Sequence, residues 1–150
     1  MKISIIIPVL NEAGVIEDTL RALQFMRQRG HQVIVVDGGC TDQTLIKAAP
    51  LTDYIIKSKC GRAAQMNTGV KLACGEMLWF LHADTVVPQD ADYLILKALD
   101  STSQPFRHWG RFNVRLSGNN PMLRVIEFFM NLRSRVTGIA TGDQGIFVRR

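Results

Sequence analysis

The sequence predicts an α/β fold of three layers, in which helices cover both faces of a mostly parallel central sheet. Short apolar runs alternate with segments whose apolar residues recur at helical spacing, and this order repeats over the first hundred residues. Several runs are apolar without alternation, which is typical of strands buried on both faces. Strands that alternate with helices form right-handed βαβ units, so the sheet is expected to be parallel.

The predicted elements can be justified in chain order. The β-branched run Ile3–Val9 indicates a central strand, and Val15 to Arg29 indicates a covering helix that ends at Gly30. Gln32–Val36 indicates a second buried strand. The later elements are a helix from Thr41 or Asp42 to Ala49, a strand at 54–57, a helix at 61–74 with Ala63, Met66, Val70 and Ala73 inward, a strand at 77–81, a helix at about 90–99, a half-exposed strand at 109–116, a helix from Pro121 to about Arg135, and a strand from Ile146.

The helix from Pro121 combines a strongly apolar composition with three arginines, Arg124, Arg133 and Arg135. Two interpretations fit this pattern. The helix can lie in the core with its arginine heads reaching water, or it can lie on an anionic surface. Core helices are the more common class, so we expect the first.

Composition indicates one domain of a soluble globular protein, since 47% of the 150 residues are hydrophobic and 21% are charged. Three cysteines, Cys40, Cys60 and Cys74, fit neither a disulfide framework nor zinc ligation, so we expect reduced thiols and a cytoplasmic protein. The first apolar run is short and interrupted by Pro8, which favours a strand over a signal peptide. No run of about 18 apolar residues exists to span a membrane.

The net charge of +5 is unevenly distributed, with −1 in residues 1–100 and +6 in residues 101–150. A basic surface attracts phosphates of a nucleotide, a phospholipid or a nucleic acid. Because no recognition helix or base-stacking pattern accompanies the charge, we expect no nucleic acid partner. A phosphate-rich or lipid-linked partner is expected instead, with peripheral contact at the inner face of the membrane.

Carboxylates lie next to three predicted strands. Asp37 follows the second strand, Asp84 follows the strand at 77–81, and Asp143 precedes the last strand. Ligands bind at the carboxyl ends of strands in open α/β sheets, which makes these side chains candidates for chemistry. Each can also be an ordinary turn residue, because Asp is common in turns and caps.

Five motifs in order resemble the family 2 glycosyltransferases of the GT-A fold, over nearly the whole chain. They are Pro8-Val9-Leu10-Asn11-Glu12, the loop from Val35 to Asp42, the helix start from Gly61 to Gly69, Leu81-His82-Ala83-Asp84, and Gly142-Asp143-Gln144.

The resemblance implies an inverting enzyme that moves a sugar from a nucleotide-diphosphate sugar to a hydroxyl acceptor. It implies Asp84 as ligand of Mn²⁺ or Mg²⁺ and Asp143 as general base, in a GT-A domain that is incomplete at its C-terminus. The resemblance also implies that the donor is bound by Pro8, Asn11, Glu12, Asp37, Gly38, Arg62, Asn67, His82 and Ala83. A donor part of about 1–100 and an acceptor part of about 101–150 would share the single domain.

Two positions depart from the family pattern. Gly38 stands where the family has a second Asp, and His82 stands where the metal motif has its first Asp. His82 can hydrogen-bond the ribose, supply nitrogen to Mn²⁺, or simply face solvent. The sequence His82-Ala83-Asp84-Thr85 resembles a bacterial subgroup labelled arsenosugar-biosynthesis glycosyltransferases.

Other functions fit less well. A dinucleotide-binding dehydrogenase needs G-x-G-x-x-G at its first helix, which is absent, and a nucleotidyltransferase would carry a basic Gly-rich loop where this chain has Leu10 to Gly14. The main alternative is a non-catalytic nucleotide-sugar-binding remnant, or part of a site that missing sequence or another subunit completes. Sugar, base, acceptor and oligomeric state are left open.

Overall fold

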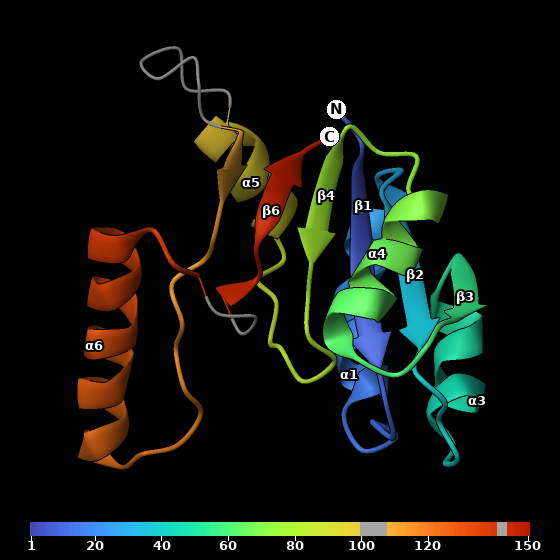
Figure 1. Ribbon diagram of the computed structural model, residues 1–150, viewed down its shortest axis with the longest axis horizontal. Coiled ribbons are helices and arrows are strands. Elements are labelled where there is room, and N and C mark those ends of the chain that lie inside the picture. Colours follow the sequence, from blue (N-terminus) through green and yellow to red (C-terminus); the bar gives the residue numbers. More distant parts are fainter. Residues whose placement is uncertain (100–107, 141–143) are drawn as a thin grey trace.

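The computed structural model describes residues 1–99, 108–140 and 144–150, and these build one six-stranded sheet in the order β3-β2-β1-β4-β6-β5 (Figure 1). Strands β1 (Ile3–Val9), β2 (Gln32–Asp37), β3 (Tyr54–Lys57) and β4 (Met77–Phe80) are parallel. β6 (Phe147–Arg149) pairs antiparallel with β4, and the two-residue β5 (Trp109–Gly110) pairs antiparallel with β6. The predicted mostly parallel α/β sheet is confirmed.

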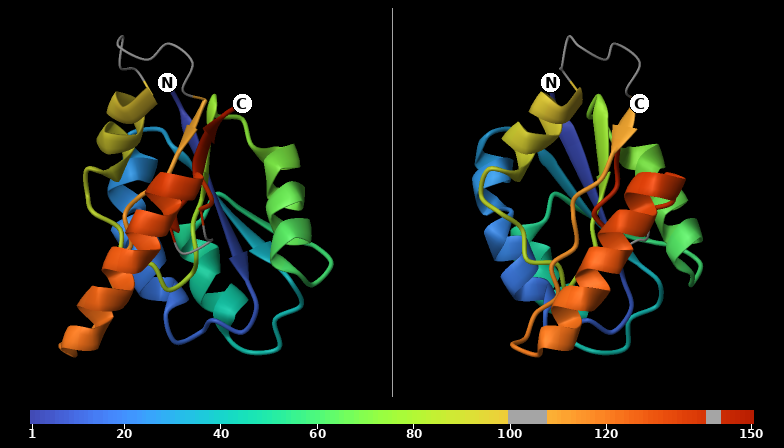
Figure 2. Two further views of the ribbon diagram at one scale, coloured as in Figure 1. Left: turned by 60° about the vertical axis from the view of Figure 1, so that its left-hand side comes forward. Right: turned by 90° about the vertical axis from the view of Figure 1, so that its left-hand side faces the viewer.

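Helices cover both faces of the sheet, as Figure 2 shows. One face carries α1 (Ile16–Ala22), α2 (Gln24–Gln28), α3 (Thr44–Ala48), the short 3₁₀ helix η1 (Ala49–Leu51) and α5 (Ala91–Leu99). The other face carries α4 (Arg62–Leu72). The helix predicted over 15–29 is thus two helices, α1 and α2, which meet at Leu23 (φ −82°, ψ −8°).

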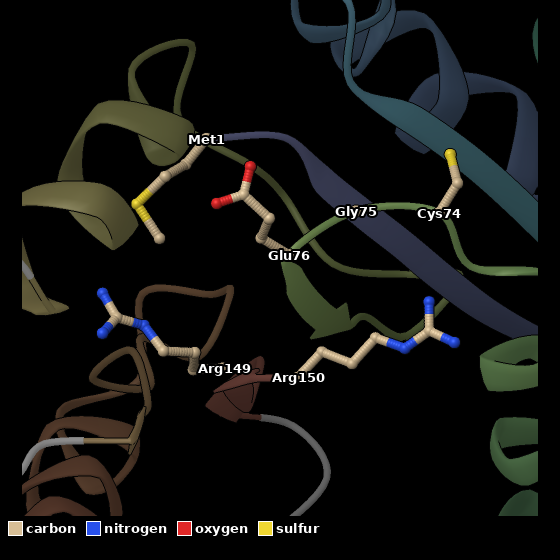
Figure 3. A pocket seen from close by; sticks show the side chains of 6 residues that line it. All are labelled: Met1, Cys74, Gly75, Glu76, Arg149 and Arg150. Carbon is tan, nitrogen blue, oxygen red and sulfur yellow. The ribbon is translucent and has the colours of Figure 1, made fainter.

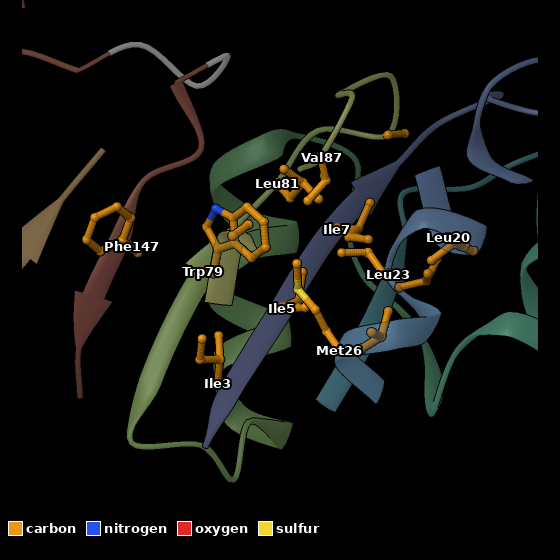
Figure 4. Packing of buried hydrophobic residues seen from close by; sticks show 14 of the residues in the cluster. Ile3, Ile5, Ile7, Leu20, Leu23, Met26, Trp79, Leu81, Val87 and Phe147 are labelled. Carbon is orange, nitrogen blue, oxygen red and sulfur yellow. The ribbon is translucent and has the colours of Figure 1, made fainter. Parts of the chain in front are cut away.

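The larger core lies between the sheet and the helices α1, α2 and α5 (Figure 4). Alternate residues of β1 point into it, and Leu20, Leu23 and Met26 approach from the helices, each without exposed surface. Trp79 of β4 and Phe147 of β6 lie at the end of this core. The ring of Phe112 contacts both of them at centroid distances of 5.6 Å, tilted against Trp79 and edge-on to Phe147.

Helix α4 packs on the opposite face through Gln65 and Gly69, which lie four residues apart on one side, and the buried Ala73 follows its last residue. A Cβ atom on Gly69 would stand 2.5 Å from Cγ2 of Ile6, so the glycine allows the helix to approach the sheet closely. The predicted inward position of Ala63 is wrong, since Ala63 is exposed and the buried side of the helix is set by this glycine.

The strand predicted over 109–116 is wrong beyond Gly110. The segment 111–116 bonds to side chains of α6 (Pro121–Thr137) instead of to another strand. Asn131 accepts from Val114 N at 2.9 Å and donates to Val114 O at 3.0 Å, and Glu127 accepts from Leu116 N. The alternation in the sequence reflects burial of Val114 and partial burial of Phe112, and among the described residues no strand pairs with 111–116.

Helix α6 stands beside the sheet edge formed by β5 and β6 (Figure 1). Asn120 caps its start by accepting from Met122 N, and Gly138 ends it at φ +70°. The expected core position of this helix is wrong, because Ser134 is its one buried residue. None of the helices in the described parts of the chain is long and apolar enough to cross a bilayer.

Candidate functional site

The loops that follow β1 and β4 meet the start of α4 around a cavity of about 270 Å³. Because β1, β2 and β4 are parallel, their carboxyl ends lie at the same edge of the sheet. The cavity is lined by Pro8, Val9, Leu10, Glu12, Cys60, Gly61, Arg62, Gln65, His82, Ala83 and Asp84. It is smaller than the roughly 300–1,000 Å³ typical of ligand pockets, so it can enclose only part of a nucleotide sugar.

Asp84 is presented by an anchored loop. Thr19 of α1 donates its hydroxyl proton to Ala83 O at 2.6 Å, and Leu81 N donates to Ile6 O at 3.1 Å, which continues the sheet pairing past β4. Asp84 itself is exposed and makes no ion pair or hydrogen bond with the described residues. The preceding His82 is buried at the cavity wall. The loop therefore offers one uncommitted carboxylate at the cavity rim.

Gln65 of α4 joins the ends of the first two strands beneath the cavity. Its side-chain nitrogen donates to Val9 O at 2.9 Å and to Val36 O at 2.8 Å. Only 3% of Gln65 is exposed, so these bonds form away from competing water. Parallel strands separate where their ladder stops, and the amide holds the two loops at a fixed spacing.

Gly38 leaves room for this amide. A Cβ atom at Gly38 would stand 3.0 Å from three atoms of the Gln65 side chain. The glycine that replaces the family's second Asp is therefore matched by the glutamine on the facing helix.

Asp37 orders the loop that follows β2. Its Oδ1 accepts from Gly39 N at 2.9 Å and from Cys40 N at 2.7 Å. Burial alone would raise the pKa of Asp37, but the hydrogen bonds from Cys40 and Gly39 and the charge of Lys57 hold that pKa below its ordinary value. The carboxylate is therefore ionised at neutral pH, although it is 2% exposed and does not line the cavity.

Asn11 connects the loops that follow β1 and β2. It adopts a left-handed backbone (φ +56°), which Asn tolerates better than most residues. Its Oδ1 accepts from Thr41 N at 2.9 Å, and the neighbouring Glu12 N donates to Thr44 Oγ1 at 2.8 Å. Glu12 then faces the cavity.

Arg62 is the first residue of α4 and is exposed at the cavity rim, directly after Gly61 (φ +124°). Arg62 thus stands at the positive end of an eleven-residue helix whose first N–H groups have no side-chain cap. This end of α4 is suited to a phosphate or another anion.

Six predicted site residues line the cavity together: Pro8, Glu12, Arg62, His82, Ala83 and Asp84. Asn11, Asp37 and Gly38 shape the loops behind it, and Asn67 is exposed on α4 outside the lining. Asp143 lies outside the described residues. Sequence reasoning missed Gln65, although a glutamine four residues before Gly69 on the apolar side of a helix signals a buried amide that needs partners.

A divalent ion fits the groups at the rim. No cluster of three or more His, Cys, Asp or Glu side chains able to hold a metal occurs among the described residues. A single uncommitted carboxylate, Asp84, still suits Mg²⁺ or Mn²⁺, because such ions take their other ligands from phosphate oxygens and water.

A larger and more open cavity of about 630 Å³ lies at the opposite end of β1 and β4 (Figure 3). Its lining includes Glu76, Arg149 and Arg150. None of the predicted site residues lines it, so size alone does not identify the site.

The sequence is similar to those of known proteins. The pattern of the family described as "Glycosyl transferase family 2" matches residues 4–146. Poly-beta-1,6-N-acetyl-D-glucosamine synthase of Staphylococcus aureus (strain MSSA476) is 30% identical over 101 residues, which cover 63% of this chain and 24% of that protein. An uncharacterized glycosyltransferase of Rickettsia conorii is 26% identical over 122 residues, covering 78% of this chain and 20% of that protein. The chain thus spans about a quarter or less of the length of these relatives.

Solved structures share the fold. The mannosyltransferase PcManGT of Pyrobaculum calidifontis, solved with GDP-Man and Mn²⁺, matches with a TM-score of 0.76 at 22% identity, over 99% of this chain and 44% of that one. Glucosyl-3-phosphoglycerate synthase of Mycobacterium tuberculosis, solved with Mn²⁺, UDP-Glc and phosphoglyceric acid, matches with a TM-score of 0.72 at 18% identity, over 99% of this chain and 56% of that one. The predicted GT-A fold is confirmed by these matches. Because the family pattern covers almost the whole sequence, the chain belongs to glycosyl transferase family 2.

Proposed function

We propose that this chain binds a nucleotide-diphosphate sugar at the cavity between β1, α4 and the loop after β4, and transfers the sugar to a hydroxyl acceptor with inversion. One observation carries the proposal. Arg62, Glu12, His82 and Asp84 converge on one cavity at the carboxyl end of the sheet, in a chain of glycosyl transferase family 2. The donor part is about residues 1–100, and the acceptor part is about residues 101–150.

The donor-side roles follow from charge and position. Asp37 and Asn11 set the loop that holds the base or ribose, with Gly38 leaving the backbone accessible. Arg62 and the start of α4 bind phosphate oxygens. Pro8, Glu12, His82 and Ala83 form the cavity wall beside the sugar nucleotide. Asn67 is kept as a weaker donor-binding candidate, since it lies outside the lining.

Asp84 would hold Mn²⁺ or Mg²⁺, and His82 is a second candidate ligand or a ribose partner. When bound, such an ion neutralises the negative charge that grows on the diphosphate leaving group. Both solved relatives described above were obtained with Mn²⁺ and a nucleotide sugar. From the motif His82 to Thr85 we also propose that the chain belongs to the bacterial subgroup labelled arsenosugar-biosynthesis glycosyltransferases.

Asp143 would act as the general base. Direct displacement at the anomeric carbon needs a group that takes the acceptor hydroxyl proton on the face opposite the leaving phosphate, and a carboxylate suits this role. The motif Gly142-Asp143-Gln144, which resembles the family's catalytic-base position, supports the assignment. The basic balance of residues 101–150 favours an acceptor that carries phosphate or a lipid.

Calorimetric titration of UDP-, GDP- and dTDP-sugars, with and without Mn²⁺, tests the donor site. We expect the nucleotide sugar of one base to bind, and to bind more tightly when Mn²⁺ is present. Asp84→Ala should remove the Mn²⁺-dependent part and leave the metal-free affinity nearly unchanged. Asp90→Ala, an exposed carboxylate outside the cavity, is the matched control and should change neither value.

Three other outcomes would each have a different meaning. Equal weakening with and without Mn²⁺ in Asp84→Ala would mean damage to the fold, and circular dichroism would register that damage. No binding of any donor would exclude the donor site itself. Donor binding without turnover on any hydroxyl acceptor would favour a non-catalytic nucleotide-sugar-binding protein, or a site completed by further sequence or another subunit.

A further inference from the structure

The helix α6 contacts the domain with its polar side. Asn131 and Glu127 hydrogen-bond the backbone of the segment 111–116, and Ser134 donates to Gln144 Oε1 at 3.2 Å. The opposite side of the helix is apolar and faces away from the sheet. Its members recur at spacings of three and four and are 42–78% exposed: Val125, Phe128, Phe129, Leu132 and Val136. We call these five residues the outer stripe.

Such an orientation is unusual for a helix on the surface of a domain, which normally turns its apolar stripe toward the core. The outer stripe is also extended at both helix ends by Met122 and Ile139, each about 60% exposed. A contiguous apolar patch of this kind indicates a surface that binds something.

Arginines border the outer stripe on both sides. Arg135 follows Phe128 by seven residues, and Arg133 follows Phe129 by four, which places them on the two flanks of the stripe. Both are exposed, and neither forms an ion pair with any residue that the structure describes. Glu127 is the one acidic residue in 108–140, and it turns inward to pair with Arg124 at 2.9 Å.

We propose that the outer stripe of α6 inserts into the surface of an anionic phospholipid bilayer, with Arg133 and Arg135 at the level of the phosphates. An apolar stripe flanked by cations matches the boundary between acyl chains and headgroups. A second copy of the chain fits less well, because packing stripe against stripe would bring four unpaired arginines together with no acid on either helix surface to balance them.

The orientation has a consequence for the proposed function. The first turn of α6 lies toward the end of the molecule where the carboxyl ends of β1, β2 and β4 lie (Figure 1). Binding of the stripe to a bilayer would bring the donor cavity near the headgroups. A hydroxyl acceptor carried on a lipid would then reach the site from the α6 side. Membrane binding itself needs no donor, so the two proposals can fail separately.

Vesicle flotation of the 150-residue chain tests the surface. Vesicles of phosphatidylcholine are compared with vesicles of phosphatidylcholine and phosphatidylglycerol, at low and high salt. We expect about tenfold or more stronger partitioning into the anionic vesicles at low salt, because each basic residue near such a surface contributes about 1 kcal/mol. High salt should reduce the difference, since exposed charges are screened.

Two pairs of substitutions separate the apolar and charged contributions. Phe129→Ser with Leu132→Ser should lower binding to both vesicle types, by about tenfold, because two apolar side chains no longer leave water. Arg133→Gln with Arg135→Gln should abolish the preference for anionic vesicles. Ile46→Ser on α3 and Lys71→Gln on α4 are matched controls at exposed positions, and they should bind like the unmodified chain.

The proposal is overturned if the chain floats with neither vesicle type, or if the stripe variant floats like the unmodified chain. Sedimentation equilibrium without vesicles tests whether a second copy of the chain binds the outer stripe. A dimer that Phe129→Ser dissociates, in a chain that ignores vesicles, would assign the stripe to a second copy. Donor titration on the same samples shows whether the donor site is intact, independently of either result.

Discussion

Residues 1–99 and residues 108–140 use apolar side chains in opposite ways. In the first region, Leu20, Leu23 and Met26 of the helices are fully buried against the sheet. In the second region, Phe128 and Phe129 of α6 are each 61% exposed, while the polar Asn131 and Ser134 of the same helix make the contacts with the domain. Both regions have helices with apolar residues at the same spacing.

The comparison teaches that a helical stripe does not reveal which surface covers it. On α1 and α2 the stripe meets a sheet whose apolar face extends along it. At α6 the neighbouring segment 111–116 offers backbone groups of Val114 and Leu116, and these bond to polar side chains of the helix. The helix therefore turns its polar side inward, and its apolar side remains available.

The largest expected effect is a difference in unfolding free energy between alanine substitutions at two leucines. Leu20→Ala should lower the free energy of unfolding by about 2–5 kcal/mol, because it leaves a cavity in the core. Leu132→Ala should change that free energy by less than about 0.5 kcal/mol, because the side chain is already 42% exposed. Urea denaturation measures both. A large loss in Leu132→Ala would show that α6 is packed against the domain through its stripe.

Alanine substitutions at two glycines test the packing of the first region. Gly69→Ala should cost about 1–3 kcal/mol of unfolding free energy, because its new Cβ would overlap Ile6. At Gly14 a Cβ would meet nothing within 4 Å, so Gly14→Ala should be neutral or slightly stabilising. If thermal denaturation gave the two variants equal stability, the close approach of α4 to the sheet would be incorrect.

Gln65 tests whether the strand ends are held by a side chain. Gln65→Leu removes the side-chain amide that donates to Val9 O and Val36 O, and it should cost about 1–3 kcal/mol of unfolding free energy. It should also weaken donor binding, because the two loops lose their common anchor. Gln28→Leu on α2 is the control at an exposed glutamine. Unchanged donor affinity in a stable Gln65→Leu protein would restrict the residue to a structural role.

A smaller effect is expected from pH. His31 Nδ1 accepts from Ile3 N at 3.1 Å and Nε2 lies 3.1 Å from Asp92, which Arg29 also contacts, so the neutral ring fits both bonds. Burial lowers the pKa of His31, although Asp92 opposes the shift. With a folded pKa below the unfolded value of about 6.5, the unfolded chain binds more protons, so this stability is complete above that value and declines as pH falls below it.

His31→Gln should flatten this pH dependence. We expect the unfolding free energy of the unmodified protein to fall between pH 7 and 5 by more than that of the variant. This interval lies above the range in which Asp92 titrates, because the pKa of Asp92 is depressed by Arg29 and His31 in spite of its burial. Parallel slopes for the two proteins would contradict the neutral role of His31.

The sequence predicted the parallel sheet and the convergence at its carboxyl edge, because period and strand order determine both. Asp84 and Arg62 come together from segments more than twenty residues apart for this reason alone. The strand predicted at 109–116 and the core position of α6 failed, since the hydrophobic pattern is compatible with several partners and the choice depends on the tertiary neighbour.

The roles of individual site residues were harder to predict. Asp37 was expected to bind the base or ribose, and the structure adds that its Oδ1 accepts from Gly39 N and Cys40 N of its own loop. Gly38 was expected to let the backbone approach a ligand, and the structure adds that its missing Cβ makes room for Gln65. The contact of Gly38 with Gln65 joins two different elements, so no local pattern of the sequence encodes it.

The donor part, about residues 1–100, and the acceptor part, about residues 101–150, are assigned separate roles in the reaction, and paired measurements of donor affinity and turnover test that assignment most directly. Turnover is followed as release of the nucleoside diphosphate with a panel of hydroxyl acceptors. Asp84→Asn should lower Mn²⁺-dependent donor affinity. Asp143→Asn should keep donor affinity within a few-fold while lowering turnover by about 10²–10⁴, because a general base acts in the transition state. An Asp143→Asn protein that turns over normally, or that loses donor affinity, would contradict the assignment.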